Sequence, residues 1–216
     1  MTPGASQNSF FTFEGIDASG KTLQAQILSS RLRKESYDVL SVRDPGGVPI
    51  AERIRDILLD RNHLGMAAFT ELFLYEAARA QLVSEVILPA LEQGRIILCD
   101  RFTDSTVAYQ GYGRALPLDF IEASNTLACN GLSPARTYIL DIPWEESIKR
   151  RSIAPAEDDR MESEKELFYN NVRKAYHILA EREKTRIVLL DGVRDAEEIA
   201  DKIYKDAKHL LNRSHG

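Results

Sequence analysis

Residues 11–28, FTFEGIDASGKTLQAQIL, contain the pattern that decides the fold. An apolar run leads into a segment, 15–22, that matches G-x-x-x-x-G-K-[ST] at every fixed position. In such a loop the glycines let backbone N–H groups turn toward phosphate oxygens, the lysine reaches the β- and γ-phosphates, and the hydroxyl binds Mg²⁺. The helix that follows adds the positive end of its dipole. The predicted nucleotide-binding residues are Gly15, Ile16, Asp17, Ala18, Ser19, Gly20, Lys21 and Thr22.

The alternative for this stretch is a glycine-rich turn that binds nothing. The context argues against it, because a strand-like run at 9–14 precedes the loop and a helix-like pattern at 21–35 follows it. The loop alone does not distinguish kinases from GTPases and ATPases. The group that receives the phosphate has to be identified from other segments.

The composition fits one folded domain over residues 1–216, with 44% hydrophobic and 28% charged residues. The net charge of −5 disfavours a nucleic-acid partner, which needs a basic surface. No apolar run approaches the roughly 18 residues that span a membrane, and MTPGASQNS at the start lacks signal-peptide features. We therefore expect no membrane partner, a cytoplasmic location and a disordered lead-in at 1–8. Cys99 and Cys129 lack metal-ligand spacing and are expected to be buried.

Strand-like runs alternate with helix-like stretches along the chain. The strands are expected at 9–14, 38–42, 95–99, 136–140 and 186–190. The helices are expected at 21–35, 50–59, 67–92, 164–184 and 194–211, with Pro89 bending or breaking the end of the third. Most strands are continuous apolar runs, as in parallel sheets covered on both faces. The pattern predicts an α/β fold, a doubly wound parallel five-stranded sheet flanked by helices, with a small lid segment at 152–163.

Four further segments carry the charges of a second ligand site. They are RDPGGVP (43–49), YEAARAQ (75–81), DRFTDSTVAYQGYGR (100–114) and DDRME (158–162). Ligands of parallel sheets bind at the carboxyl ends of the strands, so Arg43 and Arg101 should approach the loop, with Arg79 reaching in from the long helix. Planar arginines suit a phosphate-bearing ligand. Alternatively, Arg43 and Arg101 are solvated charges at strand ends.

At these residues the chain closely resembles the thymidylate kinase family. The family motifs read approximately F-E-G-I-D-G-S-G-K-T-T-Q, R-E-P-G-G-T-P, D-R-A-Q, D-R-Y-x-x-S-x-x-A-Y-Q-G-x-G-R and D-R-x-E, and they are matched in order between about Phe11 and about Leu190. Asp44 stands where glutamate is usual, Leu23 replaces the second threonine, and Ala78 replaces the aspartate before Arg79. The resemblance implies a P-loop NTPase fold, ATP and Mg²⁺ as cofactors, and phosphorylation of dTMP to dTDP for dTTP synthesis. It also implies a homodimer formed through helices that include 67–92.

The resemblance further implies roles for individual residues. Asp17 contacts the sugar 3′-hydroxyl near the metal, and Thr22 and Asp100 serve the Mg²⁺, Asp100 through water. Arg79 and Arg101 hold the acceptor phosphate. The substrate-binding residues are therefore expected to be Asp17, Arg43, Tyr75, Arg79, Arg101, Ser105, Tyr109 and Gln110.

Among these, Tyr75 takes the place of an aromatic residue stacked on thymine. Ser105 and Gln110 lie along the base and phosphate, and Tyr109 crowds the position of a ribose 2′-hydroxyl. Two of the assignments have structural alternatives. Tyr75 is otherwise an ordinary core aromatic on its helix, and Asp100 otherwise caps the helix that follows it.

Phosphoryl transfer depends on positioning and charge neutralisation, and the acceptor phosphate is already anionic, so no strong general base is needed. The catalytic residues are expected to be Lys21, Asp17, Arg101 and Arg160. The resemblance places a further arginine in the lid, because the loop between the two glycines contains no basic residue. Arg150, Arg151 and Arg160 are candidates, with Arg151 expected at the ATP and Arg160 favoured by its D-R-x-E motif. Alternatively, Arg160 only pairs with Asp158 or Asp159 on a solvated loop.

Two other functions remain open at this point. A deoxynucleoside kinase would need a base for a 5′-hydroxyl, for which Asp44 is the candidate. A nucleotide-gated binding module would hydrolyse nucleotide slowly without an acceptor. The number of arginines on the acceptor side disfavours the second reading.

Overall fold

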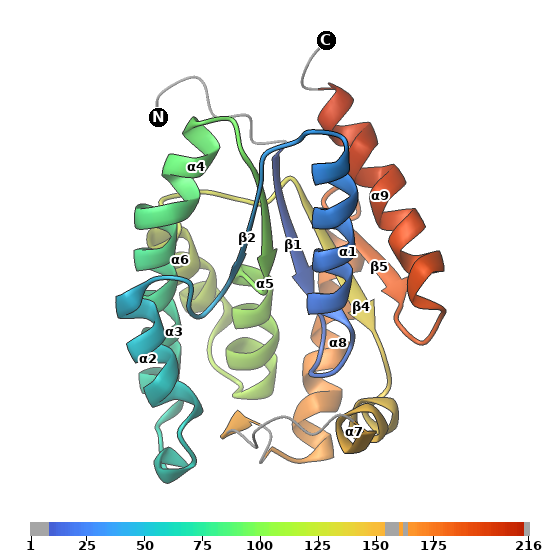
Figure 1. The fold of residues 1–216 in the computed structure, drawn as a ribbon. Helices are drawn as coiled ribbons and strands as arrows, with labels where there is room; N and C mark the ends of the chain where they lie inside the picture. The colour runs from blue at the N-terminus through green and yellow to red at the C-terminus, as the bar shows by residue number, and fades with distance from the viewer. Residues whose placement is uncertain (1–8, 154–159, 162–163, 214–216) are drawn as a thin grey trace.

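The computed structural model describes residues 9–153, 160–161 and 164–213 (Figure 1). The predicted lead-in at 1–8 and most of the predicted lid, 154–159 and 162–163, lie outside the described residues. Within the predicted lid the structure describes Ser152 and Ile153, which form the end of helix α7 (Trp144–Ile153), and Arg160 and Met161.

Five parallel strands form the central sheet, in the order β2-β3-β1-β4-β5. They are β1 (Phe10–Glu14), β2 (Val39–Arg43), β3 (Ile96–Asp100), β4 (Arg136–Asp141) and β5 (Ile187–Asp191). Each lies within one residue of the range predicted from its apolar run. The predicted fold class is confirmed.

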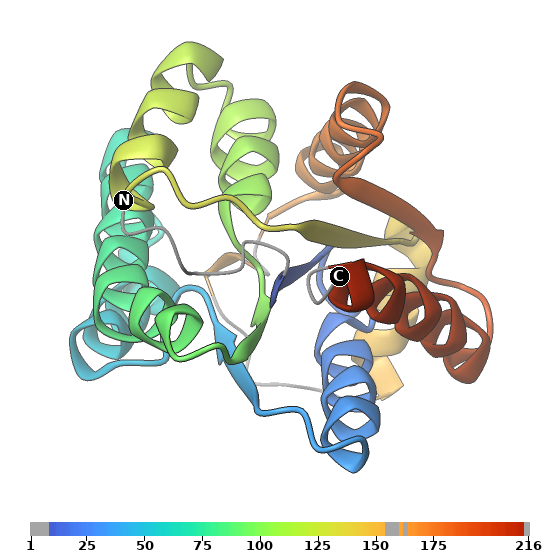
Figure 2. The same ribbon diagram turned by 90° about the horizontal axis from the view of Figure 1, so that it is seen from above.

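Helices cover both faces of the sheet (Figure 2). One face carries α1 (Lys21–Lys34) and α9 (Ala196–Arg213), whose apolar residues pack with the strands in one cluster. The helices on the other side are α2 (Pro49–Leu59), α3 (Ala68–Leu82), α4 (Leu88–Glu92), α5 (Thr103–Thr106), α6 (Leu118–Ala128) and α8 (Glu166–Arg182). The central strands β1, β3 and β4 are thus buried on both faces, which explains their continuous apolar runs, whereas the edge strands β2 and β5 are partly exposed.

The long helix expected at 67–92 is interrupted, but not where the sequence suggested. Residues Val83–Ile87 form a widened π turn between α3 and α4, in which the Leu88 N–H donates to the Val83 carbonyl. Pro89 then falls in the first turn of α4, where a missing N–H costs nothing. The proline is accommodated by a local change of winding rather than by an end of the helix.

A second helical segment was not predicted. α5 continues into a π-helical stretch, Val107–Gly113, and α6 follows it. Polar side chains such as Thr106 and Gln110 are buried in this segment. It therefore lacks the clean apolar stripe by which helices are recognised in a sequence.

Cys99 and Cys129 are buried, unbridged and packed in an apolar cluster, as expected. Within the described ranges, no helix has the length and apolar character needed to span a bilayer.

The register of the sheet aligns the residues that matter for binding. Asp100 at the end of β3 lies opposite Arg43 at the end of β2 and opposite Phe13 in β1. Glu14 is the next residue in β1. Because the three strands end at one edge, the loops that follow them converge there.

Candidate active site

The loop between β1 and α1 folds as a phosphate cradle. Gly15 and Gly20 have φ values of +134° and +99°, a region that favours glycine. A Cβ at Gly15 would lie 2.5 Å from the Leu140 carbonyl oxygen. The Nζ of Lys21 donates to the carbonyls of Gly15 (3.1 Å) and Ile16 (2.9 Å). The loop therefore surrounds a helix N-terminus, whose free N–H groups and dipole attract an anion.

The ammonium group of Lys21 is buried beside other charges. Burial, followed by the charge of Arg101, lowers the pKa of Lys21 to about 8, although Asp100 and Asp17 act in the opposite direction. A phosphate next to Nζ would favour the charged form. The group is thus suited to a ligand that brings negative charge.

The two predicted metal ligands lie together. Thr22 Oγ1 donates to Asp100 Oδ2 at 2.5 Å. Mg²⁺ in phosphoryl-transfer sites typically uses one or two protein oxygens and completes its shell with waters and phosphate oxygens. Within the described part of the chain no group of three or more His, Cys, Asp or Glu residues is arranged to hold a metal. The Thr22 hydroxyl and the Asp100 carboxylate fit the one or two protein ligands that a Mg²⁺–nucleotide complex requires.

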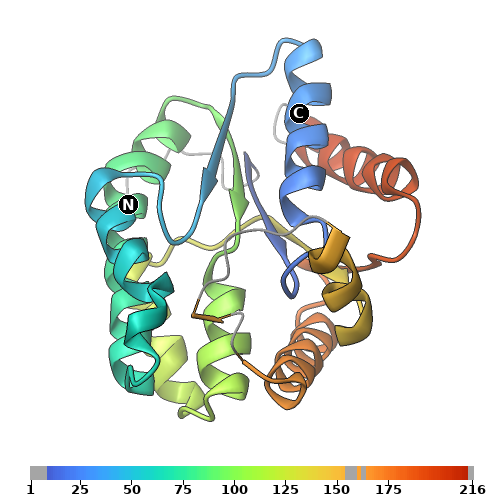
Figure 3. The same ribbon diagram turned by 60° about the horizontal axis from the view of Figure 1, so that its bottom comes forward.

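The helix α7 (Trp144–Ile153) packs against the phosphate loop and hydrogen-bonds to its carbonyl groups (Figure 3). Ser147 Oγ donates to the Asp17 carbonyl at 2.7 Å. Arg150 Nη1 lies 3.3 Å and 3.4 Å from the carbonyls of Ala18 and Ser19, and its Nη2 donates to the Gly192 carbonyl at 2.8 Å. Arg150 therefore holds the loop against the segment after β5.

Arg101 connects the cradle to a second cavity. Its backbone adopts a φ of +68°, in the left-handed region. Its guanidinium donates to Asp17 Oδ1 (2.5 Å), the Gly15 carbonyl (3.1 Å) and Ser105 Oγ (3.2 Å). It also lies 5.0 Å from the centre of the Tyr109 ring. Four residues predicted to share one site are thus in contact.

Asp17 is the charged partner at the rim of the loop. Burial alone would raise the pKa of Asp17, but the charges of Arg101 and Lys21 and a hydrogen bond from Tyr169 outweigh it, so the net pKa is lowered. The Tyr169 hydroxyl donates to Asp17 Oδ2 at 2.8 Å. Asp17 is therefore ionised and able to accept further hydrogen bonds.

Glu14 is a buried carboxylate that the motif analysis did not single out. Its Oε1 accepts from the N–H groups of Phe102 (2.7 Å) and Ser105 (3.3 Å). Its Oε2 accepts from the hydroxyls of Ser105 (2.5 Å) and Tyr176 (2.9 Å). Burial, followed by the charge of Asp104, raises the pKa of Glu14 to about 7. An acidic residue inside an apolar strand was the available signal.

Glu14 rather than Asp100 contacts the start of the helix that begins at Thr103, because it accepts from the N–H groups of Phe102, which precedes the helix, and Ser105 in its first turn. The alternative role for Asp100 is therefore not observed.

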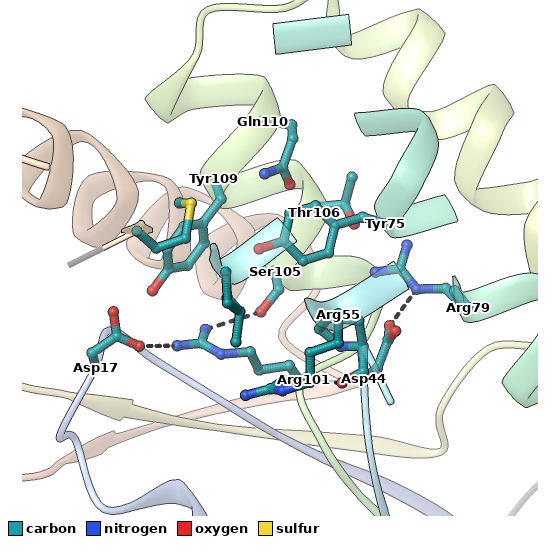
Figure 4. Close-up of a pocket in the computed structure, with 13 residues that line it drawn as sticks. Asp17, Asp44, Arg55, Tyr75, Arg79, Arg101, Ser105, Thr106, Tyr109 and Gln110 are labelled. Carbon is teal, nitrogen blue, oxygen red and sulfur yellow. Dashed lines mark hydrogen bonds and ion pairs between the residues drawn. The ribbon is translucent and has the colours of Figure 1, made fainter. Parts of the chain in front are cut away.

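Two cavities meet beside the P-loop. The larger is lined by the loop and the ends of β2 and β3, and the smaller lies between α2, α3 and the helical segment 103–113 (Figure 4). The residues that line both are Asp17, Asp44, Arg55 and Arg101. A group at this junction can be reached from both cavities.

Arg55, on α2, is a cation of the junction that sequence reasoning missed. Its Nη1 donates to the Pro45 carbonyl at 3.0 Å. Burial, and then the charge of Arg43, lowers the pKa of Arg55. Arg43 itself lines only the larger cavity and pairs with Glu52 at 2.8 Å. Arg55 therefore lies closer to the meeting point of the cavities than the predicted Arg43.

Arg79 lies apart from the junction, on the smaller cavity alone. It is buried, with Nε on Asp44 at 2.6 Å, Nη1 on Glu76 at 3.1 Å and Asn125 at 2.7 Å, and Nη2 on the Phe102 carbonyl at 3.3 Å. Ala78, which departs from the family motif, is packed in an apolar cluster. The two carboxylates that neutralise Arg79 leave it little net charge for a phosphate.

The inner end of the smaller cavity is lined by Tyr75, Thr106 and Gln110. The Tyr75 ring reaches into the cavity in Figure 4 and is half-buried, unlike a core aromatic. Thr106 Oγ1 is buried without a hydrogen-bond partner among the described residues. An unpaired buried hydroxyl facing a cavity is a ready ligand contact. Thr106 was not predicted because nothing in its local sequence distinguishes it.

The three arginines considered for the lid charge lie in different environments. Arg150 and Arg151 are on α7, and Arg160 follows it in the chain. Arg160 is buried, with Nε on the Leu58 carbonyl at 2.7 Å and Nη2 on Glu71 at 2.7 Å. The structure thus pairs Arg160 with groups on α2 and α3. Arg151 lies over Trp144 at 4.8 Å, and its charge contributes to the lowered pKa of Asp17. Arg151, on α7, also lies over Tyr169, whose hydroxyl donates to Asp17.

A phosphate cradle that opens onto a second, arginine-lined cavity defines a P-loop kinase with an anionic acceptor. Comparison with known proteins agrees with this class. A family model described as "Thymidylate kinase" matches residues 13–203. The chain is similar to thymidylate kinase of Geotalea daltonii, with 50% identity over 195 residues, 88% of this chain and 91% of that one. It is also 45% identical to that of Halothermothrix orenii over 204 residues, 94% of this chain and 97% of the relative.

A crystal structure of thymidylate kinase from Ehrlichia chaffeensis superposes with a TM-score of 0.75 at 32% identity, covering 95% of this chain and 99% of that one. The chain belongs to the thymidylate kinase family. The resemblance inferred from its five motifs is confirmed.

Proposed function

We propose that the two cavities divide the reaction of a thymidylate kinase, ATP + dTMP → ADP + dTDP, with ATP in the larger and dTMP in the smaller. The observation that carries this is the junction, where Asp17, Arg55 and Arg101 face both cavities beside the P-loop. Phosphoryl transfer requires the attacking and leaving oxygens to lie in line around one phosphorus. Only at the junction can both substrates reach that position.

The donor phosphates would lie in the cradle formed by residues 15–22. Lys21 would exchange its carbonyl contacts for the β- and γ-phosphate oxygens. Thr22 and Asp100 would hold Mg²⁺, which supplies charge neutralisation of the donor phosphates when it is bound. Arg150 would keep the loop rigid through its carbonyl contacts.

The acceptor phosphate would be held by Arg55 and Arg101. Guanidinium groups on two sides of the junction can offset the repulsion between acceptor and donor phosphates. Arg79, expected from the resemblance to hold this phosphate, is better suited to the base end, since Asp44 and Glu76 already neutralise it. The same ion pair occupies Asp44, so a nucleoside kinase that uses Asp44 as its base is disfavoured.

The nucleoside would extend from the junction toward Tyr75, with the ring of Tyr75 against the base and Thr106 and Gln110 at its edge. Asp17 would accept from the 3′-hydroxyl. Tyr109 would fill the space beside the 2′-carbon. Ser105, which links Glu14 and Arg101, would lie along the phosphate.

We assign the positive charge at the transferring phosphoryl group to Arg151 rather than Arg160. Its charge already acts on Asp17 at the junction. Arg160 is committed to Glu71 and the Leu58 carbonyl. An arginine that stabilises charge on the phosphoryl group contributes to kcat rather than to substrate binding.

We further infer a homodimer. Phe69, Phe73 and Phe120 form an aromatic patch on α3 and α6, with ring centres 5.7 to 6.3 Å apart and exposed fractions of 45%, 54% and 40%. Contiguous exposed aromatics commonly mark a protein interface. A second copy is the proposed occupant, and Phe73→Asp should convert a dimer to a monomer in sedimentation. Cytoplasmic location is likewise a proposal, supported by two buried thiols without a disulfide.

The junction is tested by comparing two arginines. Arg55→Met should lower kcat/KM for dTMP by about 30- to 150-fold, the value of about 2–3 kcal/mol for a lost charged hydrogen bond. Arg43→Met, on the larger cavity only, should leave the KM for dTMP within about threefold of wild type. Equal effects on the KM for dTMP would contradict the placement of the acceptor phosphate.

A further inference from the structure

Glu71, on α3, is a fully buried carboxylate that joins two arginines to the base end of the acceptor cavity. Its Oε1 accepts from Gln110 Nε2 at 2.8 Å and Arg114 Nε at 3.1 Å. Its Oε2 accepts from Arg114 Nη2 at 3.0 Å and Arg160 Nη2 at 2.7 Å. In each of these contacts among the described residues the carboxylate accepts.

The charge state of Glu71 is fixed by these neighbours. Burial alone would raise the pKa of Glu71, but the hydrogen bonds and charge of Arg114 outweigh it and lower the net pKa. The carboxylate is therefore ionised at neutral pH. An ionised carboxylate has no hydrogen to donate.

This determines the orientation of the Gln110 amide. Its two ends are chemically different, since NH₂ donates and the oxygen accepts. Because Glu71 only accepts, Gln110 must present its NH₂ to Glu71. Its amide oxygen is then left for the smaller cavity, which Gln110 lines beside Thr106. Figure 4 shows the Gln110 oxygen directed down into the cavity.

We propose that Glu71 is a positioning residue that locks the Gln110 amide oxygen into the cavity, so that the site selects a pyrimidine carrying a hydrogen on N3. This deepens the proposed function, on which it rests. Thymine and uracil carry N3–H and can donate to the amide oxygen. Cytosine has a bare N3, so two acceptors would face each other in a buried site.

The neighbouring hydroxyl cannot supply this selection. Thr106 can rotate its hydrogen to donate or accept, so it tolerates either base. Discrimination by N3 therefore falls to the amide, whose orientation is set from outside the cavity. Glu71 should not distinguish dTMP from dUMP, because both carry N3–H.

The test is the ratio of kcat/KM values for dTMP and dCMP in Glu71→Gln. This neutral side chain can accept or donate, so the Gln110 amide is free to turn over. The dTMP:dCMP ratio should fall by about tenfold or more, mainly through a higher KM for dTMP, while the dTMP:dUMP ratio stays within about twofold. An unchanged dTMP:dCMP ratio in the folded variant would overturn the proposal.

A double-mutant cycle separates positioning from a merely structural role. In a Gln110→Ala background, Glu71→Gln should have no further effect on the dTMP:dCMP ratio, because the amide through which it acts is gone. Independent, additive effects on that ratio would contradict the mechanism. Asp206→Asn is the control for stability loss. It removes a carboxylate on α9 that pairs with Arg136 of β4, far from the proposed base contacts in sequence, and should leave the dTMP:dCMP ratio unchanged.

If Glu71→Gln does not fold, Gln110→Ala alone gives the second measurement. It should lower kcat/KM for dTMP by about tenfold and leave that for dCMP within about threefold. Equal losses for both acceptors would overturn the proposal. Wild-type enzyme that fails to phosphorylate dTMP would refute the proposed function, whereas equal use of dTMP and dCMP would refute only this inference.

Discussion

Replacement of the buried Glu14 by glutamine should change how stability depends on pH. The Glu14 carboxyl is fully buried at the end of β1, and its pKa is raised from 4.5 to about 7, chiefly by burial. Between these values the unfolded chain releases the proton while the folded chain keeps it. The contribution of Glu14 to stability therefore declines as pH rises from 4.5 to 7 and is constant above that window.

The magnitude follows from the shift. At about 1.36 kcal/mol per pKa unit, the full window corresponds to about 3 kcal/mol, of which about 2.5 kcal/mol falls between pH 5 and pH 8. Glutamine does not titrate, so this amount should appear in the difference between the two proteins. Relative to Glu14→Gln, the wild type should lose about 2.5 kcal/mol of unfolding free energy from pH 5 to pH 8.

Urea denaturation of both proteins at the two pH values measures this difference, because other titrating groups cancel. Glu181→Gln is the matched control. Glu181 is exposed on α8 and its pKa is lowered from 4.5 by Lys184, so it is ionised in the folded chain and largely ionised in the unfolded chain above pH 5, and its difference from wild type should stay nearly constant from pH 5 to pH 8. If the difference in unfolding free energy between wild type and Glu14→Gln changes by less than about 0.5 kcal/mol from pH 5 to pH 8, burial does not raise the pKa of Glu14.

Three further outcomes test the site. Lys21→Ala should lower kcat by about 100-fold or more with the fold intact, since loss of one contact to a transferring oxygen typically lowers kcat by about that factor. Single-turnover transfer within about tenfold of wild type would show that Lys21 does not have this role. Tyr109→Ala should raise the kcat/KM for UMP relative to dTMP, because space for a 2′-hydroxyl opens, and an unchanged ratio would show that Tyr109 does not read the sugar. Arg151→Ala should lower kcat with little change in the KM for dTMP, whereas Arg160→Ala should raise that KM through its contact with Glu71. The reverse pattern in steady-state kinetics would show that Arg160, and not Arg151, stabilises the transferring phosphoryl group.

Local chemistry explains what could be predicted from the sequence. A phosphate loop needs its glycines, lysine and hydroxyl in one contiguous segment, so residues 15–22 were identified without tertiary information. The strands were found because burial on both faces leaves long apolar runs. The register then brought Arg43 and Asp100 to the same edge, as parallel strands require.

Tertiary contacts explain what could not be predicted. Arg55 belongs to no motif, and its place between the two cavities depends on where α2 packs. Arg79 matches a family motif, but its charge is taken up by Asp44, which is 35 residues away. Arg160 was expected to act on the phosphates, yet its guanidinium pairs with Glu71 on α3. Sequence patterns identify which residues are available, whereas packing decides what each one faces.

The most direct test of the account is the rate of ADP release in the presence of ATP and Mg²⁺ with dTMP, thymidine or no acceptor. The account predicts rapid release and dTDP formation with dTMP, since only dTMP brings a phosphate to Arg55 and Arg101. It predicts slow release with thymidine and slower release without acceptor. ADP release as fast with thymidine, or with no acceptor, as with dTMP would contradict the claim that the junction is built for an acceptor phosphate.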